Sequence, residues 1–245
     1  MPEPKKFTGD LSSLWKIQNI PPKQHLTWDW WWWLVMLDDE RGNPAGKQLM
    51  VLWSTKDNPL VKVNDHEWKP VGRPAIDDEG ATAMEGMVAA WWYDGQEMLE
   101  PLILEESRIV VVSENHPDWP YPKGGVVASI TEREYSMGLN SKEDKFWLRL
   151  DTEYGDFDLE MTHWNDAMSS MKVAQADYGL GMGYGISRLH GALCSGTISG
   201  KQIQGTAYFQ KVCVQAPSPP WFWGMLHFDD GSYIDWFLPH ISPTL

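Results

Sequence analysis

The sequence predicts an all-β protein, built as a barrel or a sandwich, with few and short helices. Segments rich in aromatic and β-branched residues recur at intervals of about 8–12 residues, separated by Gly and Asp turns. Helical periodicity is scarce, and the best short helix spans only residues 166–173. The chain has 245 residues, of which 42% are hydrophobic, so it can bury a sizeable core.

The expected strands begin with a hairpin, in which segments 26–37 and 47–54 are joined by a polar turn at 38–43. The other strands expected in the first half are 82–93, 97–104 and 108–114. Those expected in the second half are 125–134, 145–153, 157–165, 189–198, 203–215, 221–228 and 233–238.

A segment unsuited to a strand separates these two sets. Residues 113–125 contain three prolines and two glycines, and proline cannot join a central strand. We therefore expect a linker here, which divides the chain into two β domains, 1–115 and 116–245.

The charge of the chain excludes some partners. The formal net charge is −14 and the pI is near 4.8, whereas nucleic-acid binding requires clustered Lys and Arg. The longest apolar stretch, residues 30–37, is far shorter than the roughly 20 residues that span a bilayer as a helix. No secretory signal is recognisable at the N-terminus. We expect a cytoplasmic protein without stable membrane insertion.

The two cysteines are predicted to be free thiols. Cys194 and Cys213 flank an expected hairpin, and if Ile198 faces Ile203, then Cys194 faces Ala207. Cys213 then lies roughly 20 Å further along the strand, at about 3.4 Å per residue. A disulfide cannot bridge that distance, and reduced thiols fit the cytoplasm.

The tryptophans are the most unusual feature, since the chain has 16 of them and five lie between residues 28 and 33. Alternation places Trp28, Trp30 and Trp32 on one face of the strand and Asp29, Trp31 and Trp33 on the other. Neither face is polar, so we expect the strand to be covered on both sides. These side chains could form core alone. Their number and the carboxylate among them instead favour a pocket for a large apolar ligand.

Asp29 is the first candidate catalytic residue. A carboxylate within an apolar run must be hydrogen-bonded, for example to a Trp N–H or a turn amide, or else paired or protonated. If burial keeps it protonated, it is a general acid. Glu85 is the second candidate, because it shares a face with Met87, Ala89 and Trp91 and would join Asp29 if that face met the tryptophan hairpin. The predicted ligand-binding residues on these strands are Trp30, Trp31, Trp33, Trp91 and Trp92.

The glycine-rich segment 179–185 has no surrounding strand–helix unit, so it is not a phosphate loop. We expect a flexible loop at a pocket mouth, with Tyr178 and Tyr184 as gate residues that contact the ligand. The seven histidines show no metal-ligand spacing, and no Gly-x-Ser-x-Gly motif is present. We expect neither a metal nor a cofactor.

Two segments resemble a known family. Residues 28–33 resemble the acid-Trp-Trp-aromatic signature of the carotenoid 1,2-hydratase (hydroxyneurosporene synthase) family, which is grouped with AttH-like proteins. Residues 196–211 resemble the late hairpin of that family. The resemblance implies two lipocalin-like β domains packed together, in a hydratase that protonates an isoprenoid alkene. Tryptophan rings would then stabilise the carbocation.

Three functions remain open on these residues. The first is an enzyme of this lyase type, or a terpenoid cyclase or isomerase, acting on an isoprenoid or polyene. The second is a non-catalytic lipocalin-like carrier of a lipid or pigment. The third is a carbohydrate-binding β-sandwich, which would require exposed rather than buried tryptophans.

Overall fold

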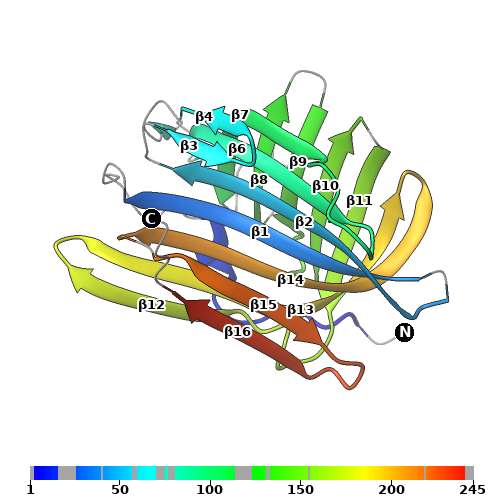
Figure 1. Ribbon diagram of the computed structural model, residues 1–245. Coiled ribbons are helices and arrows are strands. Elements are labelled where there is room, and N and C mark those ends of the chain that lie inside the picture. Colours follow the sequence, from blue (N-terminus) through cyan, green and yellow to red (C-terminus); the bar gives the residue numbers. More distant parts are fainter. Residues whose placement is uncertain are drawn as a thin grey trace.

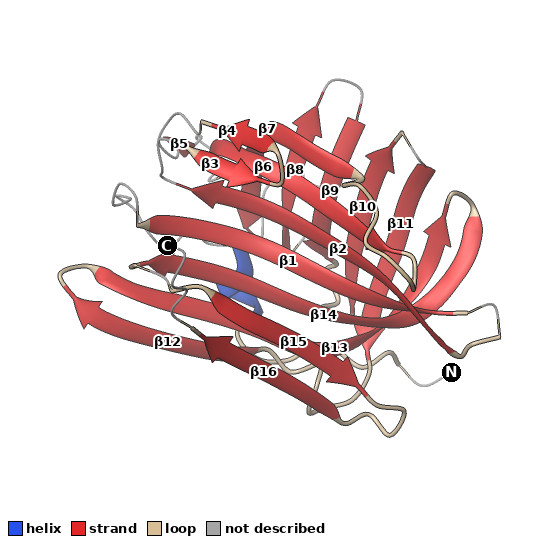
Figure 2. Cartoon of the chain, in the orientation of Figure 1, coloured by secondary structure: helices blue, strands red, loops and turns tan. Residues whose placement is uncertain are grey.

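The computed structural model describes residues 3–15, 26–39, 41–56, 60–69, 75–76, 81–113, 123–130, 133–153, 155–217 and 219–240. These residues confirm the all-β class, because they form strands and one short 3-10 helix, η1 (Leu11–Trp15) (Figure 2). The strands before residue 115 are β1 (Thr27–Asp38), β2 (Pro44–Lys56), β3 (Val61–Val63), β4 (His66–Trp68), β5 (Ala75–Ile76), β6 (Thr82–Tyr93) and β7 (Ile103–Ser113). The later strands are β8 (Gly124–Ile130), β9 (Arg133–Leu139), β10 (Lys145–Thr152), β11 (Gly155–His163), β12 (Lys172–Gly179), β13 (Met182–Ile198), β14 (Lys201–Gln215), β15 (Trp221–His227) and β16 (Tyr233–Pro239).

Ten of these strands close into a single antiparallel barrel (Figure 1). Around the barrel the order is β1, β2, β6, β7, β8, β9, β10, β11, β13 and β14, and β14 pairs with β1. Chain order and spatial order therefore agree, as in up-and-down barrels, where closure leaves no free sheet edge. β12 pairs with β13 outside the ring, and β15–β16 form a separate hairpin.

Both halves of the chain contribute to this one barrel, where the sequence predicted a domain in each half. The boundary at 115/116 lies between β7 and β8, which pair from Ile109↔Ala128 to Ser113↔Gly124. β1 and β14 join the two halves again on the other side. Each half supplies too few barrel strands to cover its own apolar face, so the halves complete one another.

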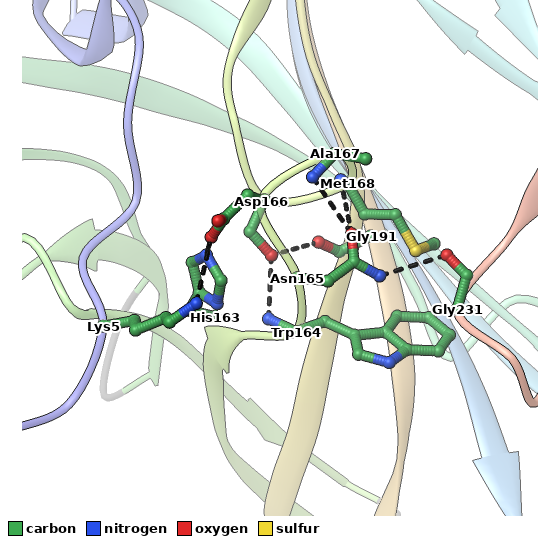
Figure 3. Close-up of polar contacts among 10 residues, drawn as sticks. Lys5, His163, Trp164, Asn165, Asp166, Ala167, Met168, Gly191 and Gly231 are labelled. Atoms are coloured by element: carbon green, nitrogen blue, oxygen red, sulfur yellow. Dashed lines mark hydrogen bonds and ion pairs between the residues drawn. The ribbon is translucent and has the colours of Figure 1, made fainter. Parts of the chain in front are cut away.

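Several local predictions need correction. Segments 97–104 and 108–114 are not two strands, since β7 runs continuously from Ile103. The predicted strand 125–134 is divided between β8 and β9. The predicted helix 166–173 is a turn that leads directly into β12. The side-chain oxygen of Asn165 accepts the backbone N–H groups of Ala167 and Met168 and closes this turn (Figure 3). The chain then pairs with Thr8 at Ser170, so the turn does not continue as a helix.

Strand β1 is covered on both faces, as expected. On the inner face Trp31, Trp33 and Val35 have no exposed surface. On the outer face Trp32 packs against Trp223 of β15, at 4.7 Å between ring centroids. The hairpin β15–β16 thus covers part of the outside of the barrel (Figure 1).

Both cysteines are buried free thiols, which confirms that prediction. The register of their hairpin differs by two residues, because Ile198 pairs with Lys201 and Cys194 with Gly205. Across the described ranges, no helix has the length and apolar character needed to cross a bilayer.

Candidate functional site: a buried ion pair inside the barrel

The inner face of β1 and β14 carries an ion pair. Lys211 Nζ lies 2.7 Å from Asp29 Oδ1, and the two side chains are 2% and 1% exposed. The strand register explains the meeting, since Lys211 lies opposite Trp31, two residues along β1 from Asp29 on the same face. The sequence required the Asp29 carboxylate to be hydrogen-bonded, paired or protonated, and the structure shows that it is paired with Lys211. The other carboxylate oxygen, Asp29 Oδ2, is buried and has no hydrogen-bond partner among the residues that the structure describes.

This buried pair is expected to add little to the stability of the fold. Removing two charges from water costs several kcal/mol per ion, and apolar side chains of similar volume are often as stabilising or more so. An unpartnered buried acceptor such as Asp29 Oδ2 costs about a further 1–3 kcal/mol. A charged group held at such a disadvantage inside an apolar barrel is a candidate functional group.

An aromatic ring and the N-terminal segment enclose the pair. Lys211 Nζ lies 5.3 Å from the centroid of the Trp31 ring, within the range of a cation–π contact. The indole N–H of Trp31 donates to the backbone oxygen of Leu14 in η1, at 2.7 Å. Ser13 and Ser187 join their hydroxyls at 3.1 Å, and Ser187 lies opposite Lys211. Helix η1 therefore lies on the inner side of the sheet, beside the ion pair (Figure 2).

The chain before η1 is held at this end of the barrel by several contacts. The N–H of Phe7 donates to the oxygen of Glu143, and Thr8 forms a parallel bridge with Ser170. Lys5 Nζ lies 3.3 Å from Asp166, which also contacts His163 (Figure 3). These contacts fix the chain just before η1, whose Ser13 and Leu14 contact Ser187 and Trp31 on the inner face of the sheet.

The remaining inner tryptophans reach across the barrel. Trp33 contacts Phe146 of β10 at 5.6 Å between ring centroids. The indole of Trp53 donates to the backbone oxygen of Tyr135 on β9, at 3.0 Å. In each case the two strands are four positions apart around the ring. These two rings therefore form much of the barrel core.

The predicted acid pair is not assembled. Asp29 faces the interior, whereas Glu85 is exposed and lies on the outer face of β6, opposite Arg108. The face of β6 that turns inward contains Val88 and Ala90, which are fully buried.

The predicted ligand-binding tryptophans are divided between the two faces of the sheet. Trp31 and Trp33 point inward, and Trp92 packs against the inner cluster and Phe157. Trp30 belongs to the outer face of β1. Trp91 lies on the outer face of β6, where its indole N–H donates to Asn64 at 3.3 Å.

The glycine-rich segment is the turn of a regular hairpin rather than a flexible loop. β12 and β13 pair up to Gly179↔Met182, and Leu180 and Gly181 have positive φ values of 56° and 71°. Tyr178 is 58% exposed, and its ring lies 6.1 Å from that of Tyr184. Tyr184 lies opposite Val214, on the outer face of the sheet, away from the ion pair.

Sequence reasoning missed a second polar cluster, between the barrel and the hairpin β15–β16. Asp235 Oδ2 lies 3.5 Å from both Arg188 and His190, and Asp235 Oδ1 accepts the indole N–H of Trp223 at 2.9 Å. Burial by itself would raise the pKa of Asp235, but the contact with His190 and the charge of Arg188 lower it on balance. The sequence did contain one indication of this cluster, because side chains alternate along a strand and Arg188 and His190 therefore share one face. This cluster attaches the hairpin to the barrel.

Comparisons with known proteins agree with this fold. No protein-family model and no curated protein matches the sequence. Among solved structures, the chain is similar to a protein from Nitrosomonas europaea provisionally assigned as AttH, with 11% identity and a TM-score of 0.50 over 91% of this chain. The chain spans 64% of that protein's length. It is also similar to the S-type phycobiliprotein lyase CPES from Guillardia theta, with 9% identity and a TM-score of 0.28, over 86% of this chain and 99% of that one. The first likeness shows a lipocalin-like barrel, and at this identity it shows the fold alone.

Proposed function

We propose that the barrel binds an apolar small molecule that carries one polar group, with the Asp29–Lys211 pair as its polar anchor. The observation that carries this proposal is the sealed ion pair, whose second carboxylate oxygen has no partner. Binding sites of this kind combine apolar and aromatic walls with a few polar groups that orient the ligand.

The chemistry of the site indicates the class of ligand. A ligand hydroxyl would donate to Asp29 Oδ2 and so satisfy an acceptor that is otherwise buried at a cost. The apolar body of the ligand would contact the rings of Trp31 and Trp33, which are fully buried on the same face. An isoprenoid or polyene alcohol has both parts. The ligand would enter beside η1, where the backbone oxygen of Leu14 accepts the indole N–H of Trp31.

A catalytic role at the same site is a second candidate, because the pair contacts an aromatic face that suits a cation. The acid that protonates an isoprenoid double bond would be the carboxyl group of Asp29 in its protonated form, because an ammonium group such as that of Lys211 is too weak an acid for this step. The carbocation would be stabilised by Trp31, and water would add to it and return a proton to Asp29. Hydration, cyclisation and isomerisation all begin with this protonation.

The carbohydrate-binding alternative receives no support from the burial of the tryptophans. Sugar platforms need exposed rings, whereas the tryptophans at the proposed site and in the barrel interior, Trp31, Trp33 and Trp53, are inaccessible to solvent.

Quenching of tryptophan fluorescence by all-trans-retinol tests the binding proposal. We expect saturable quenching by the native protein and an at least tenfold weaker affinity for Asp29→Asn, which loses the charge that Lys211 pairs with. Asp158→Asn is the matched control, because its carboxylate is 60% exposed and pairs with Arg149 on the surface. Equal affinities of Asp29→Asn and the native protein would refute the proposal. Mass spectrometry of the extracted ligand then separates binding from hydration, which adds one water.

A further inference from the structure

The hairpin β15–β16 has two contrasting faces. The face toward the barrel carries the polar cluster of Asp235 and the packed ring of Trp223. The opposite face consists of three cross-strand rows, and each contains only apolar residues or glycine. These rows are Phe222↔Leu238, Gly224↔Trp236 and Leu226↔Ile234.

This outward face is exposed to solvent. Phe222 is 64% exposed, Leu238 58%, Ile234 49%, Leu226 48% and Trp236 39%. Fully covered Phe and Trp side chains bury about 150–250 Å² each and Leu and Ile are of a similar order, so at these exposed fractions the five present roughly 500 Å² of apolar surface. Alternating strands normally place polar residues on a solvated face. Three apolar rows on an exposed face therefore indicate an interaction surface.

The surface is also flat. A Cβ atom added to Gly224 would lie 1.9 Å from the ring of Trp236, so the indole covers the glycine closely. The ring thus fills the place where a side chain at position 224 would project. A flat, two-stranded apolar face can pack against another sheet at about 10 Å.

We propose that this face, defined by the three rows above, packs against the same face of a second copy of the chain in a two-fold symmetric dimer. The chain carries a net charge of −14, which opposes self-association over most of its surface, but the three rows contain no charged residue. Two acidic molecules approach each other with least repulsion through their uncharged surfaces. The area is also sufficient for a dimer. Two faces of roughly 500 Å² bury about 1,000 Å² in total, which is at the lower end of the range for specific protein–protein interfaces. A two-fold axis is the commonest way in which a single patch pairs with itself.

Sedimentation velocity over a series of protein concentrations tests the dimer. We expect the native protein to associate as a dimer, and Leu226→Glu to weaken association at least tenfold, because the substitution places two like charges in one symmetric interface. Phe222→Glu is a second variant, chosen because Phe222 is the most exposed of the five side chains. Leu180→Glu is the matched control, since Leu180 is 87% exposed on the separate β12–β13 hairpin and should leave the dimer unchanged.

Near-ultraviolet circular dichroism verifies that each variant is folded. A native protein that remains monomeric up to high concentration overturns the proposal, as does a dimer that persists in both folded Glu variants. A monomer that cosediments with phosphatidylcholine vesicles, and loses this binding in Leu226→Glu, would overturn the dimer in favour of a lipid surface.

Discussion

Removing only the lysine from the buried ion pair should destabilise the protein more than removing both charges. In Lys211→Met the carboxyl group of Asp29 loses its ammonium partner, and at 1% exposure no solvent can replace it. Its second oxygen has no partner in the native protein either. An uncompensated buried charge of this kind costs about 3–5 kcal/mol. For a chain of this size each kcal/mol lowers Tm by about 2–4 °C, so we expect a decrease of roughly 6–20 °C.

The double variant Asp29→Leu with Lys211→Met isolates the cause. Replacing a buried pair by apolar side chains is often neutral or stabilising by about 1–4 kcal/mol, so this variant should unfold at a urea concentration close to that of the native protein. It should at the same time fail to bind retinol. Urea titration at pH 7 of the native protein, both single variants and the double variant completes the cycle. A loss below about 1 kcal/mol in Lys211→Met would contradict the burial of the pair.

Two further predictions concern pH and backbone packing. Burial lowers the pKa of His227, so the folded state binds fewer protons at this residue than the unfolded state does. The free energy of unfolding should therefore fall as the pH decreases through about 6.5. In urea titrations between pH 8 and pH 5, His227→Gln should reduce this pH dependence, and an unchanged dependence would contradict the prediction. The lowered pKa of Asp235 contributes stability above about pH 4 that is lost on further acidification, so Asp235→Asn should lose the additional decline below that pH. Gly205→Ala should cost at least about 1–3 kcal/mol, because the new Cβ would lie 2.1 Å from the backbone oxygen of Met36, and an unchanged Tm would show that β1 and β14 can separate without strain.

Much of the fold was predictable because it depends on local patterns. The aromatic strands with Gly and Asp turns predicted an all-β chain, and the absence of a polar face on residues 28–33 predicted cover on both sides of that strand. The number of domains, by contrast, could not be predicted from local patterns. The predicted boundary at 115/116 lies between the end of β7 at Ser113 and the start of β8 at Gly124, yet these two strands pair directly. Composition shows which segment does not form a strand. It does not show which strands pair on either side of that segment, because this pairing is set by the closure of the barrel.

For the candidate site, too, local patterns predicted which residues share a face, but not which distant residues they contact. Alternation by itself placed Asp29 with Trp31 and Trp33 and required that the carboxylate find a partner. That this partner is Lys211, 182 residues away, follows only from the register of β1 against β14. Glu85 is on the outer face of β6 because the barrel turns Val88 and Ala90 inward. Local periodicity defines which residues share a face. Which face becomes the interior, and which distant side chains meet there, is decided by the closed sheet, because pairing between strands depends on contacts that no local pattern contains.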